Sequence, residues 1–199
     1  MSNPITFRAM EDADQPMLRQ WRNDPEVARH LYSGGAITPE EQAAWWERTK
    51  QDTASRYWII CLDGTPVGAV NLANIDPEEK TASWACYLAD PAIRRRGIGL
   101  YVEFCLLVYA FSVLRLSALH CEALVSNEVA CTMQESIGFE RIVMLKDRCI
   151  KDGVPQNAIA YRMASVAWST EHRPRLENRL RRKGIEPVAA LPPLGKDVL

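Results

Sequence analysis

The 199-residue sequence has no run of about 18 consecutive apolar residues, the length that a helix needs to cross a membrane. It also has no apolar stretch near residue 1 that resembles a signal peptide. We therefore expect neither secretion nor membrane insertion, and we expect the chain to work in the cytoplasm. Its length suits a single compact core of the mixed α/β type.

The sequence also lacks an excess of acidic or basic residues. Lys and Arg number 24 and Asp and Glu number 25, so the formal net charge is −1. A general nucleic-acid-binding domain would be strongly basic, and this balance therefore argues against nucleic acid as a partner.

The cysteines lack the spacing of a metal site or of a disulfide framework, and we expect no bound metal. Most of them lie in apolar runs, so they are expected to be buried, reduced side chains. This usage is typical of a reducing compartment. The six positions are Cys61, Cys86, Cys105, Cys121, Cys131 and Cys149.

A basic, glycine-containing turn stands between a strand-like run and a long apolar run, residues 100–114, that is expected to be a helix. Gly97 and Gly99 allow the backbone to approach an anion. The free N–H groups of a helix start attract that anion, and the arginines at 94–96 add positive charge. The turn lacks the Gly-Lys-Ser/Thr of a Walker A loop, and Val102 stands where the dinucleotide fingerprint needs a small residue. The pattern predicts a different kind of phosphate-binding turn.

The order of motifs resembles the GCN5-related N-acetyltransferase superfamily. Arg-x-x-Gly-x-Gly at 94–99 is followed by Asn127 and Ala130, and then by Gly138-Phe139. Ser126 and Asn127 are suited to cap a helix that Gly138 would end. The resemblance implies acetyl-coenzyme A as co-substrate, with its diphosphate on the turn. The cofactor-binding residues so implied are Cys86, Tyr87, Leu88, Arg94, Arg95, Arg96, Gly97, Ile98, Gly99, Leu100, Asn127 and Ala130.

The fold expected from these motifs is α/β (α+β), the acetyltransferase fold. It has a mixed central sheet flanked by helices and splayed between residues 81–88 and 116–125, where coenzyme A would enter. The sequence pattern predicts strands at 5–8, 57–62, 67–72, 81–88, 118–125, 141–147 and 156–164, with helices after residues 12–14, over 25–31, after a capping box at 38–41, over 100–114 and over 128–137.

The chain is expected to divide into an acetyltransferase domain, residues 1–168, and a C-terminal segment, residues 169–199. The segment contains an Arg-rich helix over 173–183 and a proline-rich tail, both expected to be exposed and the tail poorly ordered. A nucleic-acid-binding tail is the alternative, although three glutamates interrupt its positive charge.

The amino-terminal half narrows the substrate. Residues 18–29 and 37–45, together with Lys151-Asp152-Gly153, resemble the nucleotide-sugar N-acetyltransferases of pseudaminic acid biosynthesis, over residues 5–165. That family acetylates the 4-amino group of UDP-4-amino-4,6-dideoxy-N-acetyl-β-L-altrosamine, a step toward a flagellin glycan. The Trp-Arg-Asn opening is shared with acetyltransferases of ribosomal-protein N termini. Substrate-binding candidates are Arg22 and Arg29 for the diphosphate, and Tyr32, Trp45 and Tyr87 for the uracil, with core packing as the alternative for the aromatics.

The reaction implied is direct attack of an amine on the thioester. A backbone N–H within residues 86–88 is the predicted oxyanion donor. Glu122 is the predicted base, acting directly or through water, and His120 on the same strand face is the second candidate. Ordinary structural roles are the alternatives for both side chains. Gln134 stands where many family members have a tyrosine that protonates the leaving thiolate. An amide cannot act as that acid, so Gln134 is expected to hydrogen-bond the sulfur or order a water.

Two other functions stay open on the sequence alone. One is acetylation of a protein N terminus or another small amine, for which the pocket would be open or strongly acidic. The other is non-catalytic sensing of acetyl-coenzyme A, which the change at Gln134 would allow. Exposed apolar faces on such sheets favour a homodimer.

Overall fold

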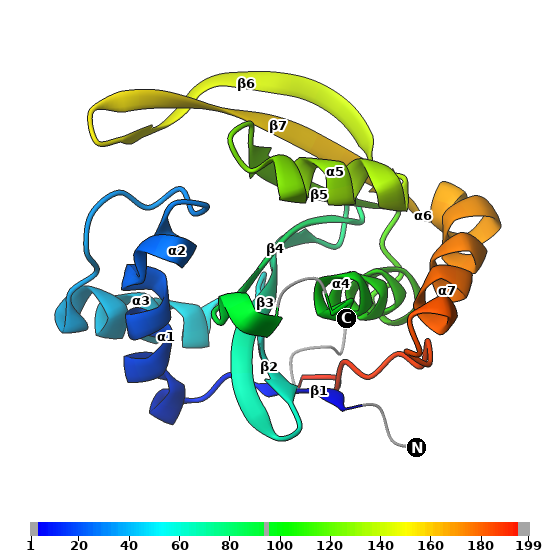
Figure 1. The fold of residues 1–199 in the computed structure, drawn as a ribbon, viewed down its shortest axis with the longest axis horizontal. Coiled ribbons are helices and arrows are strands. Elements are labelled where there is room, and N and C mark those ends of the chain that lie inside the picture. Colours follow the sequence, from blue (N-terminus) through cyan, green and yellow to red (C-terminus); the bar gives the residue numbers. More distant parts are fainter. Residues whose placement is uncertain (1–3, 94–95, 195–199) are drawn as a thin grey trace.

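The protein is represented by a computed structural model, which describes residues 4–93 and 96–194. These residues form one seven-stranded mixed sheet in the order β1-β2-β3-β4-β5-β7-β6 (Figure 1). Neighbouring strands are antiparallel except for β4 and β5, which are parallel. The strands are β1 (Ile5–Ala9), β2 (Arg56–Leu62), β3 (Thr65–Asp76), β4 (Thr81–Leu88), β5 (Ala118–Leu124), β6 (Glu140–Lys151) and β7 (Val154–Ala164).

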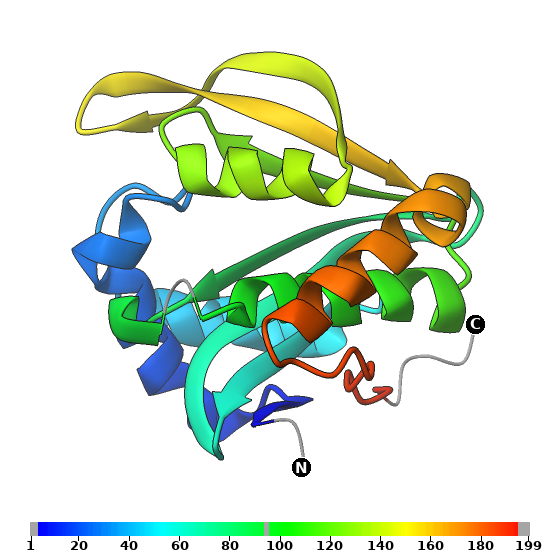
Figure 2. The ribbon, with the colours of Figure 1, turned by 45° about the vertical axis from the view of Figure 1, so that its right-hand side comes forward.

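Helices cover both faces of the sheet (Figures 1 and 2). Alternation along β2 explains this, because Trp58 and Ile60 point into the main core, whereas Ile59 and Cys61 point into a smaller core beneath α1 and α3. The helical elements are η1 (Asp12–Asp14), α1 (Gln15–Asn23), α2 (Pro25–Ala28), α3 (Pro39–Gln51), η2 (Pro91–Ile93), α4 (Ile98–Val108), η3 (Tyr109–Val113), α5 (Glu128–Ile137), α6 (Ser165–Ala167), η4 (Trp168–His172) and α7 (Arg173–Arg182).

Local sequence signals set several helix ends, as predicted. Thr38 accepts a hydrogen bond from the N–H of Glu41, whose side chain bonds back to Thr38, and this capping box starts α3. Asn127 accepts from the N–H of Ala130 at the start of α5. Gly138 ends α5 in the left-handed conformation, with φ of 110°.

The sheet is splayed between β4 and β5, which confirms the predicted architecture. The two strands pair over three residues only, from Thr81–Ser83 to Ala118–His120. Beyond this point β4 continues to pair with β3 as far as Leu88, and β5 continues to pair with β7 as far as Leu124. One edge of β4 therefore borders a gap in the sheet.

The C-terminal segment corrects one expectation. Leu176 and Leu180 of α7 are buried, and the segment that follows packs on the core. The Tyr101 hydroxyl donates to the carbonyl of Val188 at 2.6 Å, and the indole N–H of Trp58 donates to the carbonyl of Pro192 at 3.0 Å. The predicted helix is therefore exposed on one face only, and the tail predicted to be poorly ordered packs on the core as far as residue 194; residues 195–199 lie outside the described part.

Other elements differ in their bounds. The helix predicted over 100–114 begins at Ile98, and its last turn, η3, is π-helical, with the N–H of Leu114 bonded to the carbonyl of Tyr109 at 3.1 Å. Strands β6 and β7 extend much closer to their turn than predicted, and α2 ends at Ala28. No helix in the described ranges is both long enough and apolar enough to span a bilayer.

Candidate active site

Two cavities meet at β4 on the splayed side of the sheet. The first has a volume of about 650 Å³ and lies between β4, the start of α4, α5 and α7. The second has a volume of about 230 Å³ and lies between the sheet and the helices α1 and α3. Cys86 and Tyr87 line both cavities, so a ligand in one can reach a ligand in the other at this position.

The glycine turn forms one end of the first cavity. Gly97 has φ of 85°, a left-handed conformation that favours glycine, and it is the residue that precedes α4. The N–H of Tyr101 bonds to the carbonyl of Gly97, so the amides of residues 98–100 have no intrahelical acceptor. Such a helix start attracts a phosphate group.

Most of the predicted cofactor residues lie at this cavity. Ile98 is buried in the core and Arg96 is exposed, and neither lines the wall. Arg94 and Arg95 lie outside the described residues. The predicted residues that do line it are Cys86, Tyr87, Leu88, Gly97, Gly99, Leu100, Asn127 and Ala130.

The open edge of β4 supplies backbone groups to the gap. The N–H of Ala89 donates to the carbonyl of Val67 in β3 at 2.8 Å, and Tyr87 pairs with Ala69 in the same register. Because successive amides of a strand point to opposite edges, the N–H groups of Cys86 and Leu88 point toward β5, where the strands have separated. These two amides can bind a ligand that lies in the splay.

The second cavity has a mainly aromatic and apolar wall. Of the predicted substrate residues, Arg22, Trp45 and Tyr87 line it, whereas Arg29 lines the first cavity. Gln42 is buried in this wall; its side-chain N–H donates to Gln15 at 2.8 Å, but its carbonyl oxygen has no hydrogen-bond partner among the described residues. A buried acceptor without a donor is costly. This oxygen has almost no exposed surface of its own, so it binds an N–H or O–H group of a ligand only if the side chain turns toward the cavity.

Glu122 lies on β5 in a polar cluster and lines neither of the two cavities. Its carboxylate accepts a hydrogen bond from the Tyr32 hydroxyl at 2.8 Å and another from the Arg148 Nε at 2.7 Å. The Arg148 guanidinium also lies 4.9 Å from the centre of the Tyr32 ring. Burial and the bond to Glu122 raise the pKa of Tyr32, so it remains a phenol that donates. Tyr32 lines neither cavity.

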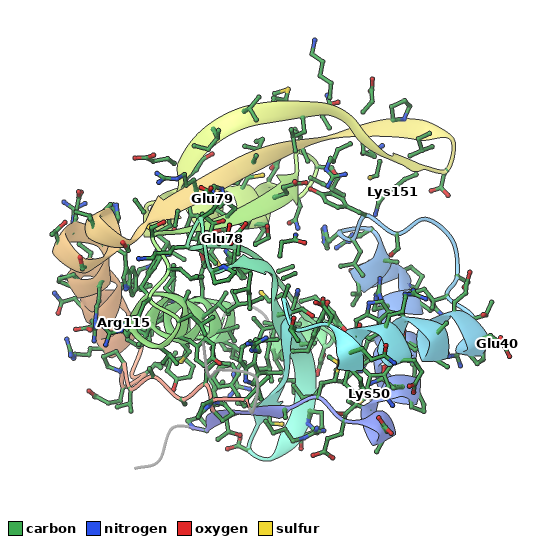
Figure 3. The ribbon with its side chains drawn as sticks, turned by 180° about the vertical axis from the view of Figure 1, so that it is seen from behind. Glu40, Lys50, Glu78, Glu79, Arg115 and Lys151 are labelled. Atoms are coloured by element: carbon green, nitrogen blue, oxygen red, sulfur yellow. The ribbon has the colours of Figure 1, made fainter. Side chains whose placement is uncertain are left out.

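This cluster belongs to a connection across the cleft, between the β6–β7 hairpin and the segment after α2. Lys151, labelled in Figure 3, donates from its Nζ to the carbonyl of Ala28 at 2.7 Å. The hairpin and the amino-terminal helices thus hold each other on the open side of the sheet.

His120 and Gln134, the other two predicted catalytic residues, lie apart from the Glu122 cluster. His120 is half-buried and pairs with Ser83 at the closed end of the splay. Burial and the nearby charge of Arg162 lower the pKa of His120, which keeps its ring neutral. Gln134 is buried on α5 and its Oε1 accepts from the thiol of Cys121 at 3.5 Å. Neither side chain lines either of these two cavities.

The sequence interpretation missed several residues of these walls. Gln42 lies in a segment that was interpreted only as a helix cap, and Asn71 reaches the wall only through the tertiary fold. Arg148, which lines neither cavity but bonds to Glu122, was missed for the same reason. Arg179 and Lys183 were assigned to an exposed helix, although the four-residue spacing of Leu176 and Leu180 was a signal that α7 packs on the core. Among the described residues, no group of three or more His, Cys, Asp or Glu side chains is arranged to bind a metal.

Comparisons with known proteins agree with this geometry. A family model described as an acetyltransferase (GNAT) domain matches residues 5–140. The chain is 24% identical over 176 residues to the putative ribosomal N-acetyltransferase YdaF of Bacillus subtilis, covering 84% of this chain and 94% of that protein. It is 22% identical over 133 residues to acetyltransferase PseH of Campylobacter jejuni, covering 67% and 81%. The spermidine N-acetyltransferase of Vibrio cholerae, solved with CoA and spermine, has a TM-score of 0.77 at 18% identity, covering 84% and 99%.

The chain therefore belongs to the GNAT acetyltransferase family. It is an acetyl-coenzyme-A-dependent N-acetyltransferase, and the predicted superfamily, fold and enzyme class are confirmed.

Proposed function

We propose that the protein acetylates the 4-amino group of a UDP-linked 4-amino-4,6-dideoxy sugar, as in pseudaminic acid biosynthesis. The observation that carries this proposal is the chemistry of the second cavity. Its wall combines the aromatic rings of Trp45, Tyr57 and Tyr87 with the guanidinium of Arg22 and the amide of Asn71. Aromatic faces suit a sugar or base, and a guanidinium suits a diphosphate.

Electrostatics separates this acceptor from a polyamine. The described residues that line the second cavity include Arg22 and no Asp or Glu. A polyamine is a polycation, and it would have to enter beside a fixed positive charge with no carboxylate in the described wall to neutralise it. A sugar nucleotide has one amine and a negatively charged diphosphate, and Arg22 attracts that diphosphate.

Gln42 adds a directional contact. Its unpartnered carbonyl oxygen can accept from a sugar hydroxyl or from the N–H of an acetamido group. The cavity of about 230 Å³ is small, so it receives the sugar ring and its amine, while Arg22 binds the diphosphate and the uridine extends toward the outside.

The reaction then proceeds in one complex. The amine in the second cavity attacks the thioester carbonyl at the junction beside Cys86 and Tyr87. The N–H of Cys86 or Leu88 stabilises the oxyanion, Glu122 removes the proton of the amine through water, and the C–S bond breaks to release coenzyme A as a thiolate. A thiol pKa of about 8.5 makes this thiolate a tolerable leaving group.

The test is release of free thiol from acetyl-coenzyme A with three acceptors: a UDP-linked 4-amino-4,6-dideoxy sugar, spermidine and a peptide with a free N terminus. We expect kcat/KM to be at least about 100-fold higher for the sugar nucleotide, since two or more polar contacts of about 1.5 kcal/mol each distinguish it. A preference for spermidine or the peptide would contradict the proposed acceptor. Absence of turnover with all three, with acetyl-coenzyme A still bound, would favour a sensor.

Substitution of Gln42 tests whether the second cavity is the acceptor site. Gln42→Leu should raise KM for the sugar nucleotide about tenfold, because a buried hydrogen bond is lost, without changing the Kd for acetyl-coenzyme A. Gln51→Leu is the matched control, since Gln51 is an exposed residue of the same helix. Equal effects of the two substitutions would remove Gln42 from the acceptor site.

A further inference from the structure

The helix α7 lies outside the residues that match the family model, yet it contributes to the wall of the first cavity. Figure 2 shows α7 crossing α4, with the C-terminal end of α7 toward the start of α4. Arg179 and Lys183, one turn apart, line the cavity. Leu176 and Leu180 on the adjoining face are buried in the core and fix the orientation of the helix.

The end of α7 is held against the glycine turn by a defined helix cap. The N–H of Ile185 bonds to the carbonyl of Leu180 at 3.0 Å, the N–H of Gly184 bonds to that of Arg181 at 2.9 Å, and Gly184 has φ of 73°. This is a Schellman motif, in which the residue after the glycine packs back on the helix. The motif fixes the position of Lys183 at the helix end.

Lys183 lies directly beside Gly97. A Cβ placed on Gly97 would lie 3.1 Å from the Cδ of Lys183 and 2.9 Å from the Cδ1 of Ile185. The absence of a side chain at Gly97 therefore allows both the turn and the close approach of the C-terminal segment. The methylene groups of Lys183 therefore lie beside Gly97, at the helix start where an anion is expected.

Among the basic residues of α7 and its cap, one group forms ion pairs and another faces the cavity. Arg173, Arg175 and Arg181 each form an ion pair with a glutamate of the same segment. Within the described residues, neither Arg179 nor Lys183 has a carboxylate within ion-pair distance. Arg179 instead donates to the Ser136 hydroxyl at 2.9 Å, which positions it on α5. Two cations without carboxylate partners thus face the cavity.

The remaining charges at this cavity are few. Arg29 lines it but pairs with Glu26 at 2.9 Å, and Glu128 is the carboxylate residue among the described lining residues. The described wall near the glycine turn is therefore positive because of α7. A phosphate group is the ligand that such a pair of cations beside a helix start would bind.

We propose that α7 and its C-terminal cap complete the phosphate-binding site of the enzyme, with Arg179 and Lys183 contacting a phosphate group of acetyl-coenzyme A. The phosphate that they contact is either in the diphosphate of acetyl-coenzyme A or the 3′-phosphate at its nucleotide end. The inference rests on acetyl-coenzyme A as co-substrate but is independent of the acceptor.

Calorimetry on the full chain tests this with coenzyme A, 3′-dephospho-coenzyme A and pantetheine. We expect Arg179→Gln and Lys183→Gln each to raise the Kd for coenzyme A about tenfold or more, the effect of losing one charge-assisted bond. Arg182→Gln, at an exposed residue of the same helix that does not line the cavity, should leave Kd unchanged. Pantetheine binding should be equal in all four proteins, because it carries no phosphate.

The measurements with 3′-dephospho-coenzyme A identify which phosphate is contacted. If the effect of a substitution persists with 3′-dephospho-coenzyme A, the contact is with the diphosphate, and if it disappears, the contact is with the 3′-phosphate. Wild-type affinity for coenzyme A in both variants, or an equal loss in Arg182→Gln, would overturn the proposal. A wild-type protein that binds coenzyme A but acetylates none of the three acceptors would contradict the proposed function alone.

Discussion

Glu103 is a buried acid within α4. Its side chain is fully buried, and neither carboxyl oxygen has a hydrogen-bond partner in the described residues. Burial raises the pKa of Glu103 well above its usual range, although the charge of Arg179 acts in the opposite direction. Burial therefore favours the protonated carboxyl group in the folded protein up to a higher pH than in the unfolded chain.

This protonation makes stability depend on pH. The unfolded chain loses the Glu103 proton above a pH of about 4.3, whereas the raised pKa lets the folded chain keep it to a higher pH. The free energy of unfolding should therefore fall as pH rises toward the folded-state pKa, by about 1.4 kcal/mol per pH unit relative to Glu103→Gln. Urea unfolding of both proteins at pH 5, 6 and 7 measures this difference. Parallel pH profiles would show that Glu103 is ionised in the folded state.

Glu122 gives a prediction for catalysis. Glu122→Gln preserves the shape and the bond from Tyr32 but removes the base, so kcat should fall about 100-fold or more. Since Glu122 lies outside the first cavity, KM for acetyl-coenzyme A should not change. Steady-state kinetics checks both parameters.

Arg148→Gln is the control, because it breaks the same ion pair and leaves the carboxylate in place. If Arg148→Gln lowers kcat as much as Glu122→Gln does, the ion pair and not the base is responsible. Wild-type turnover in Glu122→Gln would leave His120 as the candidate.

At the scale of the elements, local chemistry was enough to predict much of the fold. The capping box at Thr38, the Asn127 cap and the left-handed Gly138 each act within one turn of helix, and each was readable from neighbouring residues. The hairpin of β2 and β3 follows from alternation and the turn at residues 63–64. These signals need no information from distant parts of the chain.

What could not be predicted depends on distant partners. The acceptors of Trp58 and Tyr101 are carbonyls more than 80 residues away along the chain, and proline content alone favoured disorder for that segment. The Tyr32–Glu122–Arg148 cluster likewise joins three elements that no local pattern relates. The candidate site was therefore predicted where it lies on a motif and missed where helices from both ends of the chain complete it.

A glycine in β3 is critical for the position of β4. A Cβ on Gly68 would lie 2.3 Å from the carbonyl oxygen of Tyr87, at the junction of the two cavities. Gly68→Ala should therefore push β4 away from β3, lower the free energy of unfolding by about 1–3 kcal/mol and weaken acetyl-coenzyme A binding. Chemical denaturation and calorimetry measure the two effects.

Gly34→Ala is a suitable comparison for that substitution. Gly34 is exposed, and a Cβ there meets only the carbonyl of Ile150 at 3.3 Å. It should change both quantities much less. Equal effects of the two alanines would mean that the contact between β3 and β4 is easily relaxed.

At the scale of the whole molecule, β6 forms one edge of the sheet and carries several exposed apolar side chains. Ile142, Val143, Met144 and Ile150 are each about half exposed or more. An exposed edge of this kind tends to pair with another copy. We therefore expect the protein to be a dimer that contains the β6 surface.

Substitution of this surface tests the dimer. Ile142→Lys should shift the protein to a monomer at micromolar concentration, because a charge would be buried on association. Light scattering after size exclusion gives the mass. Val166→Lys, at an exposed apolar residue of α6 and therefore outside β6, is the control. A monomeric wild type, or a dimer that survives Ile142→Lys, would contradict the prediction.

The thiol of Cys86 is positioned to act as a reporter for both ligands. It stands where the two chambers join, and burial raises its pKa to about 12. Alkylating reagents should modify this sulfur slowly, and either substrate should shield it from its own side. Mass spectrometry of the alkylated peptide, with each substrate added alone, would then report the occupancy of either chamber through one sulfur.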